Sequence, residues 1–142
     1  MVNGSFKNWQ GMTDSGMRQV VKRIYFDVHS IRLLNSETRQ NLTDKNMVAP
    51  EETEGEVVNI GLFRHYIEAY LRKRDDVSKS ATLLVRQLEA TQSGVPIELY
   101  FFIGTTDWVS YEQKTSDILE HIYAYANEFG LQIYEGLPVA NT

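Results

Sequence analysis

Cysteine is absent from all 142 residues of the chain. Its absence excludes disulfides, thiolate zinc sites, iron–sulfur ligation and a cysteine nucleophile, and it fits a reducing compartment. Long apolar runs are also absent, since the densest one, Leu99 to Ile103, falls far short of the roughly 18 apolar residues of a membrane span. The first seven residues contain no apolar core of a signal peptide. We therefore expect one soluble globular domain that spans no membrane.

Basic residues are scarce in the C-terminal part of the sequence. Residues 89–142 contain one basic side chain, Lys114, and eight acidic ones, whereas residues 1–32 contain five basic and two acidic ones. The net charge of the whole chain is -5. An acidic body repels phosphate backbones, so we expect no nucleic-acid partner, while the basic N-terminal segment can lie near an anionic surface.

Motifs for catalysis, phosphate binding and metal ligation are absent as well. No serine elbow, Walker loop or dinucleotide-binding glycine motif occurs. His29, His65 and His121 are far apart and lack metal-ligand spacing, so we interpret them as core or surface residues. We interpret the adjacent carboxylates Asp75 and Asp76 as a solvated turn rather than a catalytic pair. We expect no enzymatic activity, and no catalytic, cofactor-binding or metal-binding residues.

Hydrophobic alternation predicts four strands, which lie at residues 18–28, 82–90, 96–104 and 131–134. The second and third strands flank the turn Gln92-Ser93-Gly94 and should form a hairpin. The third strand alternates most clearly, because its odd-numbered residues from Ile97 to Ile103 are all apolar. One face of each strand is therefore expected to be buried.

Helical spacing predicts two long helices and one short helix. The first long helix should begin at Asn59, a favourable N-cap, and end near Arg74. The second should run from about Asp107 to Gly130, a residue that readily adopts the left-handed conformation at a helix end. A short helix is expected at residues 36–45, and residues 47–56 are interpreted as a surface excursion, so that the whole insertion covers about 36–58.

The order of these elements is strand, helix, strand, strand, helix, strand. It predicts an α+β fold of the ferredoxin-like, split βαβ type, with each long helix acting as a crossover. Two helices cover only one face of a four-stranded sheet. The other face is then wet, functional or covered by a partner.

Four aromatic residues are expected on that second face, because strand alternation directs their neighbours toward the helices: Tyr25, Tyr100, Phe102 and Tyr134. The first and third strands are adjacent in this fold, so we expect Tyr25 and Tyr100 to be neighbours. Three interpretations remain open: a subunit or domain interface, shielding by residues 46–58, or stacking of RNA bases. We favour the interface, with shielding second. Stacking of RNA bases ranks last, because the C-terminal half is acidic and an RNA-recognition signature is absent.

A series of separated motifs extends from residue 5 to about residue 138. It begins with SFKNWQGM at 5–12, Asp14-Ser15-Gly16 and the basic strand entry at 18–23. The following segments are GLFR at 61–64, YIEAYLR at 66–72, VRQL at 85–88, GVPIELY at 94–100, DWVSYE at 107–112 and EFGL at 128–131. In this order they resemble the small-conductance mechanosensitive channel family, with the closest likeness to its miniconductance, osmotic-adaptation branch.

The resemblance implies that the chain is the C-terminal part of a channel. Residues 1–16 would be the end of a preceding β domain and its junction, residues 17–138 the α/β vestibule domain, and residues 139–142 a tail. The implied protein is a homo-oligomer, heptameric in the family, that passes ions and solutes under membrane tension and relieves osmotic stress without a cofactor. Its pore and gating residues would lie in a membrane-embedded part that is missing here.

In such a channel, this domain would lie on the cytoplasmic side of the inner (plasma) membrane. It would hold identical subunits together and filter solutes, and its acidic surface would attract cations. Its partners would be those subunits, the rest of the channel and the membrane. The alternative function is a soluble ferredoxin-like regulatory domain that binds a ligand or RNA.

Overall fold

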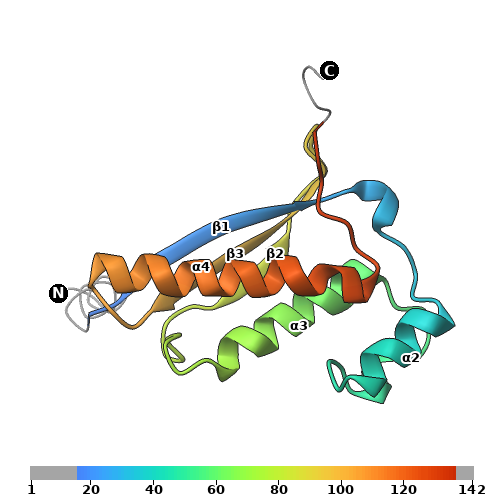
Figure 1. Ribbon diagram of the computed structural model, residues 1–142, viewed down its shortest axis with the longest axis horizontal. Coiled ribbons are helices and arrows are strands. Elements are labelled where there is room, and N and C mark those ends of the chain that lie inside the picture. The colour runs from blue at the N-terminus through green and yellow to red at the C-terminus, as the bar shows by residue number, and fades with distance from the viewer. Residues whose placement is uncertain (1–15, 137–142) are drawn as a thin grey trace, which may run out of the picture.

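The computed structural model describes residues 16–136, which form a sheet with two long helices on one of its faces (Figure 1). The three strands of the sheet are β1 (Arg18–Phe26), β2 (Leu84–Gln87) and β3 (Val95–Ile103). Their order is β1-β3-β2, and β3 pairs antiparallel with both neighbours. β1 and β2 are therefore parallel to each other, with one antiparallel strand between them, which is the split βαβ arrangement.

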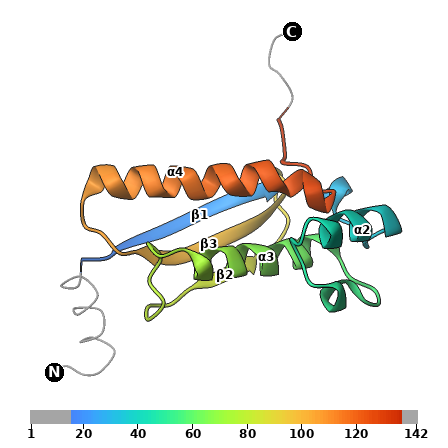
Figure 2. The same ribbon diagram turned by 60° about the horizontal axis from the view of Figure 1, so that its bottom comes forward.

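The two long helices are α3 (Asn59–Lys73) and α4 (Trp108–Tyr125), and they lie side by side over the same face of the sheet (Figures 1 and 2). The carboxylate of Asp107 caps α4 by accepting a 2.9 Å hydrogen bond from the backbone N–H of Ser110. A short 3₁₀ segment, η3 (Ala126–Phe129), follows and ends at Gly130, whose φ of 76° is left-handed as expected. This arrangement confirms the predicted α+β, ferredoxin-like fold.

The core lies between the sheet and these helices. Alternate residues of β3 from Val95 to Ile103 are almost fully buried there, together with Ile24 and Phe26 of β1. Phe63 of α3 lies at the centre, where its ring packs edge-on against Phe26 and at 4.8 Å from the ring of Phe129. Within residues 16–136, no helix is both long and apolar enough to cross a bilayer.

The insertion between β1 and α3 contains η1 (Val28–Ser30), α2 (Ser36–Asp44) and η2 (Pro50–Thr53). Its second half is mostly exposed, as the predicted surface excursion implies, but Val48 and Thr53 are buried and anchor it. The side chain of Arg39 in α2 holds this segment by donating a 2.9 Å hydrogen bond to the carbonyl of Thr53. The segment therefore extends the core at one end of the helix layer.

Two predictions about elements were wrong in detail. Residues 131–134 form one bridge, between Ile133 and Phe26, rather than a full fourth strand among the described residues. Asn59 lies inside the first turn of α3, after Val58, and is not the N-cap. Its buried side chain instead donates hydrogen bonds to the carbonyls of Ser30 and Phe129, at 2.9 and 3.0 Å. The predicted junction before Gly16 and the tail at 139–142 lie outside the described residues.

Candidate functional site

No element of residues 16–136 covers the sheet face opposite the two long helices (Figures 1 and 2). We call this the open face. Strand alternation places on it the odd-numbered residues of β1, the even-numbered residues of β3, and Leu84 and Arg86 of β2. All four predicted aromatic residues belong to it or to its margin, so this surface is the candidate functional site.

The four aromatic residues form two pairs rather than one cluster. The rings of Tyr100 and Phe102 are in edge-to-face contact on β3, with centroids 5.8 Å apart. Tyr25 and Tyr134 lie opposite each other at the far end of β1, where the N–H of Tyr134 donates a 2.9 Å hydrogen bond to the carbonyl of Tyr25. Tyr25 faces Pro96 across the sheet, so the expectation that it neighbours Tyr100 was wrong.

A charged cluster, Glu98 with Arg23 and Arg86, separates the two aromatic pairs. Glu98 of β3 lies directly opposite Arg23 of β1 and Arg86 of β2. Its Oε2 accepts a 3.1 Å hydrogen bond from Arg23 Nε, and its Oε1 accepts a 2.9 Å hydrogen bond from Arg86 Nε. One carboxylate therefore links all three strands across the middle of the open face.

The Glu98 side chain is much less exposed than the two guanidinium groups that it binds. The Glu98 side chain is 7% exposed, while those of Arg23 and Arg86 are 49% and 52% exposed. Hydrogen bonds from Arg86, and then from Arg23, hold the pKa of Glu98 below its usual value of 4.5. At neutral pH the cluster therefore carries a net charge of +1 on a chain whose overall charge is negative.

Apolar side chains surround the Tyr100 end of the open face. Val21 of β1 and Leu84 of β2 are the cross-strand partners of Tyr100, and they are 46% and 45% exposed. The hydroxyl of Tyr100 accepts a 2.8 Å hydrogen bond from the side-chain amide of Gln19. The Gln19 contact fixes the Tyr100 ring, and the exposed aliphatic groups give this end the character of a contact surface.

Residues 46–58 do not shield the open face, contrary to one of the open interpretations. Asn46 and Met47 line a groove together with Tyr66 of α3 and Tyr125 of α4, which places them on the helix side of the sheet. Farther along, Leu33 and Val58 form a bridge just before the first residue of α3. The interpretation that this segment shields the open face is therefore wrong.

A second cluster of polar and aromatic residues lies between the helices. His121 of α4 stacks on Tyr70 of α3 with ring centroids 3.8 Å apart, and the tilted ring of Tyr125 has its centroid 4.4 Å from that of His121. The hydroxyl of Tyr66 is within 2.8 Å of His121 Nε2. Burial raises the pKa of Tyr66 to about 12. These contacts tie α3 to α4, as expected of core residues.

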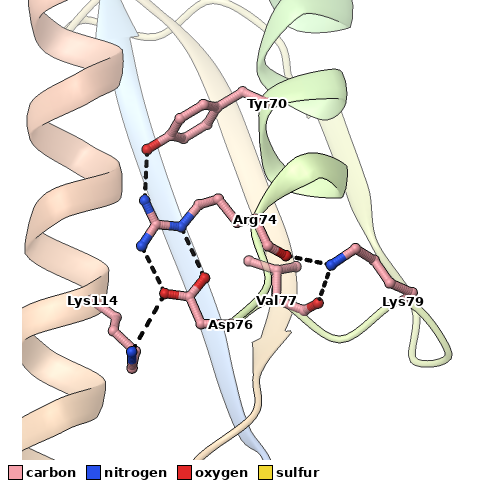
Figure 3. Close-up of polar contacts among 6 residues, drawn as sticks. All are labelled: Tyr70, Arg74, Asp76, Val77, Lys79 and Lys114. Carbon is pink, nitrogen blue, oxygen red and sulfur yellow. Dashed lines mark hydrogen bonds and ion pairs between the residues drawn. The ribbon is translucent and has the colours of Figure 1, made fainter.

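Asp76 belongs to an ion-pair network and not to the solvated turn predicted for Asp75 and Asp76. Figure 3 shows the guanidinium of Arg74 between the hydroxyl of Tyr70 and the carboxylate of Asp76. The two Arg74–Asp76 hydrogen bonds measure 2.9 and 2.7 Å, and Lys114 of α4 lies 3.6 Å from Asp76 (Figure 3). Lys79 donates to the carbonyls of Arg74 and Val77, which holds the loop after α3. The network is a structural clamp.

The histidines are dispersed in the fold as they are in the sequence. His29 lies beside Asp27 on η1, and the side chain of His65 is exposed on α3. Among residues 16–136, no three histidine or carboxylate side chains are grouped so that they could hold a metal ion. The candidate site is a surface of aromatic, aliphatic and arginine side chains.

Sequence reasoning missed Arg23, Glu98 and Arg86 as parts of the site. The signal was present, because one acidic residue and two basic residues occupy polar positions of three alternating strands. Their pairing depends on strand register, which alternation alone does not give. Val21 and Leu84 were missed for the same reason.

No protein-family model matches the sequence. Among solved structures, the fold is similar to that of MSL1 of Arabidopsis thaliana, which was determined by cryo-electron microscopy. The TM-score is 0.59 over 87% of this chain, with 9% sequence identity, and the match covers 36% of the MSL1 chain. At that identity the likeness establishes a shared fold. This chain therefore has the fold of about one third of MSL1.

Proposed function

We propose that this chain is the α/β vestibule domain of a tension-gated mechanosensitive ion channel of the small-conductance family. One observation carries the proposal: 87% of the chain shares its fold with part of MSL1, a small-conductance-like mechanosensitive channel. The ordered motifs between residue 5 and about residue 138 resemble the same family and support the proposal independently of the fold.

The role proposed for this domain is to hold subunits together through the open face. MSL1 is a multi-subunit channel. The Tyr100 end of the open face combines two aromatic rings with the exposed side chains of Val21 and Leu84. Aromatic residues are enriched in the buried centres of protein contacts, and apolar patches of this kind mark contact sites.

The proposal extends to the whole channel. The chain would belong to a homo-oligomer, heptameric as in the family, with the domain on the cytoplasmic side of the inner membrane. The channel would relieve osmotic stress, as in the miniconductance branch, and the domain would filter solutes on their way to the pore. It would act without a cofactor and without catalysis.

The channel proposal is tested on the gene that encodes this chain. The coding sequence upstream of residue 1 is expected to contain several hydrophobic spans, and the complete product in giant liposomes is expected to conduct ions when suction stretches the membrane. A reading frame without hydrophobic spans, or a complete product that stays closed at lytic tension, would overturn the proposal.

The role of the open face is tested on the chain itself. We expect the double variant Tyr100→Ser with Phe102→Ser to self-associate more weakly than the parent chain in sedimentation velocity. The matched control is Val28→Ser, which removes an apolar side chain that is 52% exposed outside the open face. Equal association of the parent, the double variant and the control, with circular dichroism unchanged, would contradict the role.

One observation favours the alternative of RNA binding. Arg23 and Arg86 are half-exposed between aromatic pairs on a sheet face, and RNA-binding sheets stack bases on aromatic residues beside basic ones. Fluorescence anisotropy with labelled single-stranded RNA separates the two functions. Binding that the Tyr100→Ser, Phe102→Ser variant loses would replace the subunit-contact proposal for this face.

A further inference from the structure

The open face and the outer side of α4 carry opposite charge. On the open face, the cluster of Arg23, Arg86 and Glu98 has a net charge of +1. The outer side of α4 exposes the carboxylates of Glu112 and Glu120, which lie about 80° apart around the helix axis. The one lysine of α4, Lys114, is directed toward Asp76 of the clamp. The solvent side of α4 is therefore an acidic stripe.

The acidic stripe also carries apolar groups. Trp108 and Tyr123 are 61% and 47% exposed, and Val109 is 54% exposed. Trp108 and Glu112 are four residues apart, and Glu120 and Tyr123 are three apart, so each pair shares one side of the helix. The stripe and the open face thus match in character, since both combine aromatic and aliphatic side chains with charges of opposite sign.

We propose that the acidic stripe of α4 in one copy of this chain packs on the open face of the next copy. This inference rests on the proposed function, because it assigns both surfaces of the subunit contact. Helix α4 and the open face lie on opposite sides of the sheet (Figures 1 and 2), so in this arrangement each copy contacts two neighbours. A contact of this head-to-tail kind closes into a ring when its rotation allows it.

Charge disfavours the symmetric alternatives. Two open faces in contact would bring together two clusters that each have a net positive charge. Two α4 stripes in contact would oppose carboxylate to carboxylate. Like charges across an interface are costly, whereas opposite charges fix the orientation of partners. The head-to-tail contact is the arrangement that pairs Glu112 and Glu120 with Arg23 and Arg86.

Cross-linking tests this geometry directly, because a chain without cysteine gives no background. Single cysteines are introduced as Leu84→Cys on the open face, Glu120→Cys on α4, and His65→Cys as a control on the exposed side of α3. With a short bis-maleimide, a mixture of the Leu84→Cys and Glu120→Cys chains is expected to give mixed dimers. Each variant alone is expected to remain monomeric, and one chain with both changes is expected to give a ladder of oligomers.

Different outcomes overturn different statements. Efficient self-cross-linking of Leu84→Cys would show symmetric contact between open faces, which overturns the head-to-tail geometry but leaves the open face a contact surface. Cross-linking of Glu120→Cys to His65→Cys would place helix layers side by side and also overturn the geometry. A Leu84→Cys chain that cross-links to no position would remove both the geometry and the role of the open face.

The charge argument has its own test at Val21, whose exposed side chain lies beside the charged cluster without being part of it. Val21→Glu is expected to weaken self-association about three- to tenfold relative to Val21→Lys, which loses the same apolar surface. Glu120→Lys is expected to weaken it similarly, and Val21→Glu with Glu120→Lys to restore it. Equal effects of Glu and Lys at position 21 would contradict charge pairing.

Discussion

The hydroxyl of Tyr66 on α3 lies 2.8 Å from Nε2 of His121 on α4, and this contact joins the two helices over the core. The imidazole also stacks on Tyr70, with the ring planes 6° apart. Burial lowers the pKa of His121 below its usual 6.5, and the nearby charge of Arg74 adds to the effect. The folded chain therefore favours the neutral imidazole.

The first prediction is a loss of stability as the pH falls below about 6.5. The unfolded chain takes up the proton near pH 6.5, while folded His121 takes it up only at lower pH, so protonation favours unfolding in this window. His121→Phe retains a stacking ring and cannot titrate. Urea unfolding midpoints at about pH 8 and about pH 5.5 are expected to differ more for the parent chain than for the variant. Equal pH dependence in both chains would assign the effect to other groups.

The second prediction concerns the clamp in Figure 3. Asp76→Asn removes the acceptor charge for Arg74 and Lys114 and is expected to lower the free energy of unfolding by about 1–3 kcal/mol. Asp75→Asn is the matched control, because Asp75 is the exposed neighbour. Urea unfolding at neutral pH compares the two variants. An equal effect at both positions would show that the clamp contributes nothing specific.

Acid titration gives the same clamp a second signature. The hydrogen bonds from Arg74, with the smaller effect of Lys114, lower the pKa of Asp76 from 3.8. The stabilisation is complete above pH 3.8 and is lost as the pH falls through the lower pKa of the folded state. The difference in stability between the parent and Asp76→Asn is therefore expected to shrink in acid.

The third prediction separates two glycines. Gly94 has a φ of 96°, and an added Cβ would lie 2.5 Å from the carbonyl oxygen of Phe26. Gly94→Ala is therefore expected to destabilise the chain by about 2 kcal/mol or more. Gly61 lies in α3 with open space at its Cβ position, so Gly61→Ala is expected to stabilise by up to about 1 kcal/mol. Thermal unfolding would show shifts of opposite sign, and shifts of the same sign would contradict the argument.

Sequence periodicity predicted the parts of the fold that depend on local patterns. The alternation in β3 identified its buried face, Asp107 marked the start of α4, and Gly130 marked the end of η3. These features follow from the geometry of single strands and helix ends. They required no knowledge of which segments meet in space.

Features that depend on distant partners were not predicted. Asn59 resembled an N-cap, but its side-chain amide donates hydrogen bonds to the carbonyls of Ser30 and Phe129, which are 29 and 70 residues away. Asp76 resembled a solvated turn until Lys114 of α4 was placed beside it. The pairing of Glu98 with two arginines likewise required the register of three strands. The contacts of Asn59, of Glu98 and between Asp76 and Lys114 are ones that only the tertiary fold creates, whereas the Arg74–Asp76 hydrogen bonds join residues two apart.

The last prediction tests whether the charged cluster stabilises the sheet. Glu98→Gln keeps the shape of the side chain but removes the charge that accepts hydrogen bonds from Arg23 and Arg86. We expect a loss of about 1–2 kcal/mol in the free energy of unfolding, at the lower end of what a charged hydrogen bond contributes, because both arginines are half-exposed and screened by solvent. Glu89→Gln, an exposed position after β2, is the matched control and is expected to change little.

Two conditions distinguish this cluster from an ordinary surface ion pair. The pKa of Glu98 is held below 4.5 in the folded chain, so the difference between the parent and Glu98→Gln should persist above that pH and diminish in stronger acid. Exposed pairs are screened by salt, whereas the Glu98 side chain is 7% exposed. The difference measured by urea unfolding should therefore fall in about 0.5 M salt, because the arginines are half-exposed, but it should not vanish. If salt abolishes it, the cluster acts as a set of surface charges and does not fix the register of the three strands.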